Sequence, residues 1–225
     1  MKVFMTIFNR YTWAIPMCEK FTKAGLEVVL IDNKSTYPPC LEWLKNCEYK
    51  VEQGTNDFGP WEFMRTDLFT KYPDRYFFLS DSDYDISMVP DDFPEFLMKG
   101  LLNTKHPEVW KAGLSLEIED FPKNNYTKQV YEHESSFWAT PQDELGFYHS
   151  WVDVGIALYD RTRRKNNWYD ALRSPRPYTC RHMDWYLTKE NVRDEDLYYF
   201  EIIDFHHHGW GRKWYYEIYL GREPT

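Results

Sequence analysis

The chain of 225 residues has no hydrophobic run long enough to cross a membrane. Its first apolar segment, Val3 to Phe8, is interrupted by Thr6 and followed at once by Asn9 and Arg10. A segment this short does not suit the core of a signal peptide either. We therefore expect no transmembrane segment and a cytoplasmic location, in a bacterial cytosol or in the cytosol of a virus-infected host.

Cysteine is scarce, and no pair of cysteines has the spacing of a zinc site. The four residues read as reduced thiols, as is usual in a chain without a signal peptide: Cys18, Cys40, Cys47 and Cys180. The H-E-x-x-H pattern of zinc hydrolases is also absent. The sequence shows no repeat period, no low-complexity stretch and no convincing domain boundary, which predicts a single domain over residues 1–225.

Basic residues are too few for a protein that binds nucleic acid polymers. There are 27 Lys and Arg against 36 Asp and Glu, so the formal net charge is -9. A nucleic acid binder would show a basic face instead. A single nucleotide is still a possible ligand, because a divalent cation can neutralise carboxylates and phosphates together.

Aromatic residues, by contrast, are abundant, with 10 Trp and 18 Tyr. Sugar rings present C–H faces that stack on aromatic rings, so carbohydrate sites use these residues. The alternative is that most of them fill the core and its rim.

The first half of the sequence alternates predicted strands and helices. An apolar strand over 2–8, a helix over 13–24 and a second strand over 27–32 form a βαβ unit with parallel strands. Further elements follow: a short helix at 41–46, a helix at 61–69, a buried strand at 76–80 and a helix after Pro90.

The second half is less regular. Strands are predicted at 110–118, 151–159 and 197–205, and a helix at 183–187, whereas 120–150 carries no clear periodicity. The pattern as a whole predicts an α/β protein with a mostly parallel central sheet.

Three predicted strands end in polar residues. The first ends in Asn9-Arg10, the second in Asp32-Asn33 and the third in Asp81-Ser82-Asp83. Ligands of open α/β sheets bind at these carboxyl ends. Clustered carboxylates repel one another unless a cation lies among them, and Mg²⁺ or Mn²⁺ prefers oxygen ligands that it can share with phosphate. A solvated acidic turn is the alternative. A dehalogenase-type phosphatase is disfavoured, because Asp85 replaces the expected Thr and its motif usually follows the first strand.

The ordered motifs TIFNR, IDNKST, TNDFGPWEFMR and FFLSDSDYD resemble the nucleotide-binding half of GT-A glycosyltransferases. Later segments, KAGLSLEIEDFP, VDVGIALY and RHMDWYL, resemble small single-domain members found in bacterial and viral glycan synthesis. The resemblance implies an α/β/α sandwich, with a nucleotide-binding half at 1–90 and an acceptor and catalytic half at 91–225.

The resemblance also implies roles for residues of the first half. Asp32 would accept a hydrogen bond from a uracil imide, with Asn33 beside it, which favours UDP. Arg65 would face the donor phosphates or sugar, although a helix-surface arginine in a local ion pair fits its position equally. The remaining positions are Thr6, Asn9 and Arg10 under the nucleoside, Ser82 beside the nucleotide, Asp81 at ribose or metal, and Asp83 as main metal ligand.

A late histidine completes the metal site in several GT-A enzymes. Here three consecutive histidines follow a predicted strand, and His208 is the favoured ligand. Three successive side chains cannot all point one way on a strand, so at most one or two would bind metal. The alternative is an exposed loop or a histidine that only packs.

The catalytic base for an inverting transfer should be a carboxylate in the second half. Asp153 is the first choice, because a charged residue between Val152 and Val154 is unusual in a buried strand. Asp184 is the second choice, and Glu117, Glu119 and Asp120 are further options. His182 would orient a carboxylate or contact a phosphate, and the candidate sugar platforms are Trp151, Trp185 and Trp210.

The sequence thus predicts a glycosyltransferase that moves a sugar from a nucleoside diphosphate sugar, preferably a UDP-sugar, to a glycan hydroxyl with Mn²⁺ or Mg²⁺. Two other functions remain open. One is a carbohydrate-binding or catalytically inactive transferase-like module. The other is a metal-dependent phosphoesterase that uses Asp81, Asp83 and the histidines.

Overall fold

The structure, a computed structural model, describes residues 1–152, 155–164, 169–203 and 213–221. Its main sheet has the strand order β3-β2-β1-β4-β9-β6-β10-β8. Strands β3, β2, β1 and β4 run parallel to one another, and β6 and β10 run parallel to each other. Strand β9 is antiparallel to β4 and β6, and β8 is antiparallel to β10. The prediction of an α/β protein with a mostly parallel central sheet is therefore confirmed.

The strands of this sheet are short, and most of them are buried. Their bounds are β1 (Lys2–Ile7), β2 (Glu27–Asp32), β3 (Lys50–Gln53), β4 (Tyr76–Ser80), β6 (Lys111–Gly113), β8 (Tyr148–His149), β9 (Ala157–Asp160) and β10 (Ala171–Arg173). Successive side chains of β1 enter two different apolar clusters. Val3, Met5 and Ile7 belong to one and Phe4 to the other, so both faces of the sheet are covered.

Helices cover both faces of this sheet, which gives the three layers of an α/β/α sandwich. One cluster receives side chains from α1 (Ala14–Lys23), α2 (Pro38–Asn46) and α5 (Phe93–Asn103). The cluster on the opposite face receives them from α3 (Glu62–Arg65) and α4 (Leu68–Lys71), which follow the 3₁₀ turn η1 (Gly59–Trp61).

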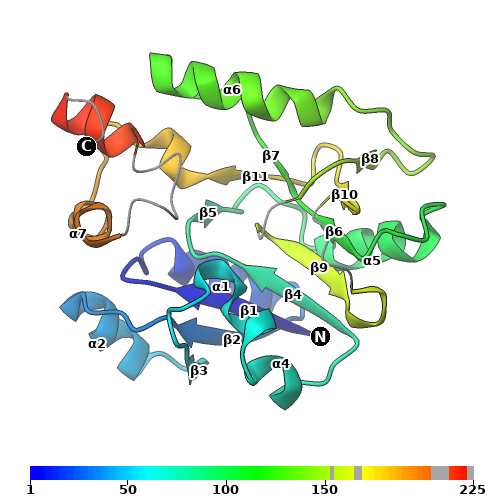
Figure 1. Cartoon of the computed structure of the whole chain (residues 1–225), viewed down its shortest axis with the longest axis horizontal. Helices are drawn as coiled ribbons and strands as arrows, with labels where there is room; N and C mark the ends of the chain where they lie inside the picture. The colour runs from blue at the N-terminus through cyan, green and yellow to red at the C-terminus, as the bar shows by residue number, and fades with distance from the viewer. Residues whose placement is uncertain (153–154, 165–168, 204–212, 222–225) are drawn as a thin grey trace.

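A second, three-stranded sheet of order β5-β11-β7 lies over the carboxyl edge of the first (Figure 1). Its strands are β5 (Tyr84–Asp85), β7 (Ser115–Leu116) and β11 (Thr179–His182). The 3₁₀ turns η2 (Arg161–Arg163) and η3 (Met183–Tyr186) follow β9 and β11. Because β5 follows the acidic end of β4 directly, this sheet brings residues of the second half to that end.

The described part of the second half contains three further helices: α6 (Asn125–Trp138), α7 (Asp194–Ile202) and the π-helix η5 (Tyr215–Leu220). Figure 1 places α6 on the opposite side of the molecule from α2 and β3. None of the helices in the described part of the chain is both long and apolar enough to span a bilayer.

Several sequence-based elements of the second half are wrong. Residues predicted as a strand at 197–205 belong largely to α7, whose first turn carries Asp194, Glu195 and Asp196 at the positive end of the helix dipole. The single strand predicted at 110–118 is two strands, β6 and β7, in different sheets. Of the strand predicted at 151–159, the described structure shows β9 only from Ala157 onward.

The first half follows the prediction more closely. Only the helix expected at 61–69 is broken, into η1, α3 and α4, and strand β3 is an addition. The stretch 120–150, which has no clear sequence pattern, contains α6. Its amino end is fixed by a reciprocal capping box between Asn124 and Thr127.

Candidate functional site

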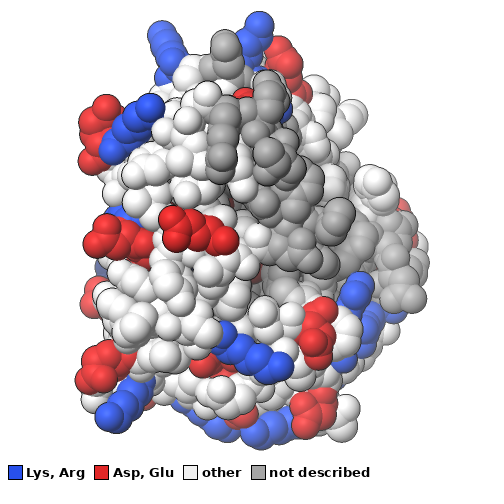
Figure 2. Space-filling model, turned by 60° about the vertical axis from the view of Figure 1, so that its left-hand side comes forward, with Lys and Arg blue, Asp and Glu red and all other residues white. Residues whose placement is uncertain are grey.

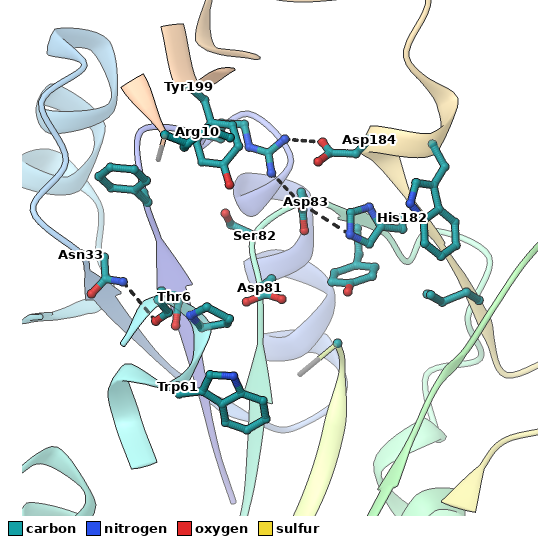
Figure 3. Close-up of a pocket in the computed structure, with 18 of the residues that line it drawn as sticks. Thr6, Arg10, Asn33, Trp61, Asp81, Ser82, Asp83, His182, Asp184 and Tyr199 are labelled. Atoms are coloured by element: carbon teal, nitrogen blue, oxygen red, sulfur yellow. Dashed lines mark hydrogen bonds and ion pairs between the residues drawn. The ribbon is translucent and has the colours of Figure 1, made fainter. Parts of the chain in front are cut away.

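A cleft of about 730 Å³ lies at the carboxyl edge of the central strands. Strands β2, β1 and β4 are parallel neighbours, so their polar ends meet there, as the sequence predicts. Residues of the second half close the other side of the cleft, from α6, β10, η3 and α7. Figure 3 shows Asp81, Ser82 and Asp83 at the end of β4, with Arg10 and His182 on either side of Asp83.

Arg10 is the central charge of this edge. Its guanidinium donates to Asp184 Oδ1 and, at 2.5 Å, to Asp83 Oδ2. Asp196 Oδ1 lies 3.8 Å from the same guanidinium, and the Tyr199 ring centroid lies 4.1 Å from its carbon. Burial opposes the charge on Arg10, but Asp184 and Asp83 hold its pKa well above the usual value. The resemblance implies a position for Arg10 under the nucleoside, and in the structure its guanidinium binds two carboxylates.

Asp83 is buried, yet it stays ionised. Burial alone would raise the pKa of this carboxyl, but His182 and Arg10 lower it below its ordinary value. His182 Nε2 lies 3.9 Å from Asp83 Oδ2, and its ring stacks on Trp185 with centroids 4.9 Å apart. The stacking fixes the imidazole so that it faces Asp83.

Asp83, His182 and Asp184 form a group that fits a divalent cation. One ligand atom from each residue lies within 4.8 Å of the other two. Two buried polar atoms of the group, Asp83 Oδ1 and His182 Nδ1, have no hydrogen-bond partner among the described residues. Two carboxylates and an imidazole are a donor set that Mn²⁺ accepts. The group thus contains Asp83, which was predicted as a metal ligand. It also contains His182 and Asp184, which were predicted for other roles.

One side of the cleft is formed by the first half of the chain. Thr6, Asn33, Asp81 and Ser82 line it, as does a loop that runs from Asn56 to Trp61. The Asn33 side-chain amide donates to the Gly59 carbonyl at 3.1 Å, which attaches this loop to the end of β2. The loop belongs to the TNDFGPWEFMR motif that the sequence analysis singled out.

Three of the predicted nucleotide-binding residues do not line the cleft. Asn9 uses its side-chain oxygen to accept from the Thr36 and Tyr37 amides, at 2.6 and 2.8 Å. Asp32 accepts from the Ser35 amide at 2.9 Å in a local turn. Arg65 is exposed on α3, with its guanidinium carbon 5.8 Å from the Phe58 ring centroid. Asn9 and Asp32 therefore shape the loop after β2.

The opposite wall of the cleft carries an aromatic and charged group that the sequence did not reveal. Glu134 of α6 and Arg173 of β10 form a buried ion pair at 2.7 Å. Arg173 also lies over the Phe137 ring, at 4.3 Å, and donates to the Trp151 carbonyl at 2.6 Å. Trp151 and Trp185, both predicted sugar platforms, line the cleft, as does His133.

A sequence signal for this wall did exist. Tyr126, Val130 and Glu134 recur every four residues and so share one face of a helix. Tyr126 and Val130 are fully buried, and Glu134 extends their row to the cleft. A carboxylate at the end of an apolar helical row is a recognisable candidate for a buried functional group.

Helix α7 connects the two sides of the cleft. The Glu195 carboxylate accepts from the Tyr11 and Thr12 amides, at 3.0 and 3.2 Å, so α7 is attached to the turn after β1. This attachment places Tyr199 over Arg10, which the prediction of a strand at 197–205 could not foresee.

Three predicted site residues lie outside the described residues: Asp153, the first choice of base, His208, the favoured late metal ligand, and Trp210, a sugar platform.

No protein-family model matches the chain, and no curated protein matches it. Among solved structures, a fragment of TarS from S. aureus, residues 1–349, is similar at 11% identity and a TM-score of 0.43 over 81% of this chain. The match covers 60% of that fragment, so the chain spans less than two thirds of it. A complex of the same fragment with UDP matches 56% of this chain at 15% identity and a TM-score of 0.34.

A CMP-2-keto-3-deoxy-manno-octonic acid synthetase in complex with CTP is also similar. Its identity is 12% and its TM-score 0.43, over 72% of this chain and 74% of that one.

Proposed function

We propose that this chain is a divalent-metal-dependent glycosyltransferase that takes its sugar from a nucleoside diphosphate sugar. The observation that supports this most is that Asp83, His182 and Asp184 lie close enough together to hold one cation, beside Asp81 and Ser82. This group stands at the carboxyl edge of parallel strands, where open α/β sheets bind nucleotides. A diphosphate needs a cation at this place because its own charges add to those of the carboxylates.

In this proposal one side of the cleft binds the donor nucleotide, the other side binds the acceptor, and both contribute ligands to the metal. Thr6, Asn33 and the loop up to Trp61 would hold the nucleoside, and Asp81 and Ser82 the ribose or phosphates. Asp83, His182 and Asp184 would hold Mn²⁺ or Mg²⁺, which neutralises the charge that develops on the leaving diphosphate. UDP is the nucleotide to test first, because the resemblance of the first half implies it. Of the Asp32-Asn33 pair only Asn33 borders the cleft, so Asn33 is the residue of this pair that could contact a base.

The acceptor would lie against the wall opposite β4. Trp151 and Phe137 offer ring faces for a sugar, and the Glu134–Arg173 pair offers polar contacts to its hydroxyls. In the transfer, the acceptor oxygen forms a bond to the anomeric carbon while the bond from that carbon to the diphosphate oxygen breaks. For inversion, the hydroxyl proton passes to a carboxylate. Asp153 remains the first choice of base, whereas Asp184, the second choice from the sequence, is here assigned to the metal and paired with Arg10.

The hydrogen bonds of Arg10 favour one rival function. Its guanidinium already neutralises Asp83 and Asp184, so a cation has to compete with it for both carboxylates. A catalytically inactive module that binds carbohydrate on its aromatic wall would need no cation. We place this function second.

One assay separates these functions. The protein is incubated with Mn²⁺ and a panel of UDP-, GDP- and CMP-sugars, and nucleotide binding and nucleotide release are measured. We expect Mn²⁺-dependent binding of one nucleotide, and its release when an acceptor glycan is added. Failure to bind any nucleotide sugar would reject the transferase, and binding without turnover would favour the module. Release of inorganic phosphate from simple esters would favour a phosphoesterase.

Asp83→Asn should remove the Mn²⁺-dependent part of nucleotide binding. The substitution keeps the shape of the side chain but deletes the charge that faces His182 and Arg10. We expect an affinity loss of at least about 100-fold, equivalent to about 2.7 kcal/mol, in calorimetric titration with UDP and Mn²⁺.

Asp85→Asn is the matched control for Asp83→Asn. Asp85 belongs to the same acidic stretch but does not line the cleft, and its carboxylate caps the Ser87 amide at 2.9 Å. Nucleotide binding should be unchanged in this variant. If Asp83→Asn bound nucleotide as the unmodified protein does, with an intact circular dichroism spectrum, the metal site would lie elsewhere.

A further inference from the structure

A second group of metal-ligating side chains lies outside the cleft. His106 and Glu108 belong to the loop between α5 and β6, and His149 belongs to the edge strand β8. None of the three lines the cleft at the carboxyl edge of the sheet. The proposed glycosyl transfer therefore gives them no role.

The three side chains converge on one point. His106 Nδ1 lies 3.1 Å from Glu108 Oε1, and His149 Nε2 lies 4.0 Å from the same oxygen. One ligand atom from each residue lies within 4.8 Å of the other two. In a tetrahedral zinc site, bonds of about 2.0–2.1 Å place the ligand atoms about 3.3 Å apart. Small side-chain rotations would bring the three atoms to that spacing.

One ligand atom of the group is also without a hydrogen-bond partner in the described part of the chain. His149 Nε2 is buried and has no hydrogen-bond partner among the described residues. The two imidazole rings lie with centroids 4.1 Å apart, an arrangement that an ion held between their nitrogens would stabilise.

We propose that His106, Glu108 and His149 form a Zn²⁺ site, with water in the fourth position. Two imidazoles and one carboxylate suit Zn²⁺ better than Mg²⁺, which prefers oxygen ligands. The ion would join the loop before β6 to β8, which pairs with only two residues of β10, Leu172 and Arg173. The bound Zn²⁺ would stabilise this edge of the sheet against unfolding.

The test is a calorimetric titration of the full chain with Zn²⁺, paired with thermal unfolding. Compared with the unmodified protein, His149→Ala and Glu108→Gln should each lose one equivalent of bound Zn²⁺ and most of the zinc-induced rise in Tm. Glu144→Gln is the matched control. Glu144 is an exposed carboxylate near the same loop, paired with Lys105, and its loss should change neither quantity.

Zinc could also bind at the Asp83 group in the cleft or at the three consecutive histidines, His206 to His208. Variants of these two regions distinguish them from the proposed site. The variants Asp83→Asn and His206→Ala/His207→Ala/His208→Ala should both keep the equivalent that His149→Ala loses. His149→Ala should in turn keep Mn²⁺-dependent nucleotide binding, which also shows that it folds. If His149→Ala and Glu108→Gln bind as many equivalents of Zn²⁺ as the unmodified protein, with the same rise in Tm, the site does not exist.

Discussion

At the scale of single residues, Arg10 decides the electrostatics of the cleft. A buried guanidinium that bridges two carboxylates does what a cation does at an acidic strand end: it removes their mutual repulsion. The resemblance to GT-A glycosyltransferases implied a nucleoside contact for Arg10. What it could not show is that Asp184, 174 positions further on, reaches the same guanidinium.

Arg10→Gln should destabilise the fold and make its stability depend on metal. The variant leaves Asp83, Asp184 and Asp196 without their shared counter-charge, and breaking a buried pair costs about 3–5 kcal/mol. Mn²⁺ should restore part of this loss and should raise Tm more in the variant than in the unmodified protein. Urea unfolding with and without Mn²⁺ measures both effects.

Arg65→Gln is the control for Arg10→Gln. This arginine is exposed on α3, so its loss should change the free energy of unfolding by less than about 0.5 kcal/mol. If Arg10→Gln were as stable as Arg65→Gln, Arg10 would not be the counter-charge of the acidic group.

Glu52 makes stability depend on pH at a place far from the cleft. Burial alone would raise the pKa of this carboxyl, but hydrogen bonds from Lys71 and Tyr72 and an ion pair with Lys50 lower it from 4.5 to about 2. A lowered pKa in the folded state contributes stability above the unfolded pKa, which is lost as pH falls toward 2.

Glu52→Gln should therefore be less stable than the unmodified protein at pH 7, by on the order of 2 kcal/mol. The difference should shrink below about pH 4.5 and vanish near pH 2, which unfolding by urea at several pH values would measure. Glu48→Gln, an exposed neighbour, should show no such difference. A difference that stayed constant from pH 7 to pH 2 would contradict this account.

At the scale of elements, the spacing of apolar residues predicted a helix or strand correctly where the same spacing continued from one end of the element to the other. Helix α1 and strands β1, β2 and β4 lie where their apolar patterns placed them. Helix α7 shows the opposite case, because the apolar run Leu197 to Phe205 suits a buried strand equally well. The acidic first turn, Asp194 to Asp196, was the local signal for a helix.

Gly100→Ala should destabilise α5 although alanine is the better helix former. A Cβ at position 100 would lie 2.5 Å from the Phe147 ring, which stacks on Phe96 of the same helix. Overpacking costs about 1–3 kcal/mol, more than the roughly 1 kcal/mol that replacing glycine contributes within a helix. Thermal unfolding measures the net effect.

Lys99→Ala is the matched control on the same helix. Lys99 is exposed, so its replacement should leave Tm nearly unchanged. Should Gly100→Ala raise Tm, the contact between α5 and Phe147 would be looser than the structure shows.

At the scale of the whole molecule, strand β9 joins the two halves of the sequence. It pairs antiparallel with β4 on one side and with β6 on the other, so one sheet runs from β3 to β8. On the face that Figure 2 shows, charged side chains of both signs are scattered over the described residues. Because one sheet contains strands of both halves, we propose that residues 1–225 form the single domain that the sequence predicts.

A single domain predicts one cooperative unfolding transition. Circular dichroism and tryptophan fluorescence should give the same midpoint in urea, because unfolding either half exposes the sheet of the other. A fragment of residues 1–90 should not fold, since β4 would lose β9 and become an exposed edge. Two separate midpoints, or a folded fragment, would show that the halves are independent units.

Local sequence patterns were enough to predict the α/β class, the parallel arrangement of the first strands and the polar residues at their carboxyl ends. These features depend on local periodicity and on the geometry of a βαβ unit, which neighbouring residues specify. Only the tertiary structure decided which residues meet at those ends. Asp184 and His182 join Asp83, Tyr199 covers Arg10, and Glu134 pairs with Arg173. Such contacts join residues far apart in the chain, and no local pattern records them.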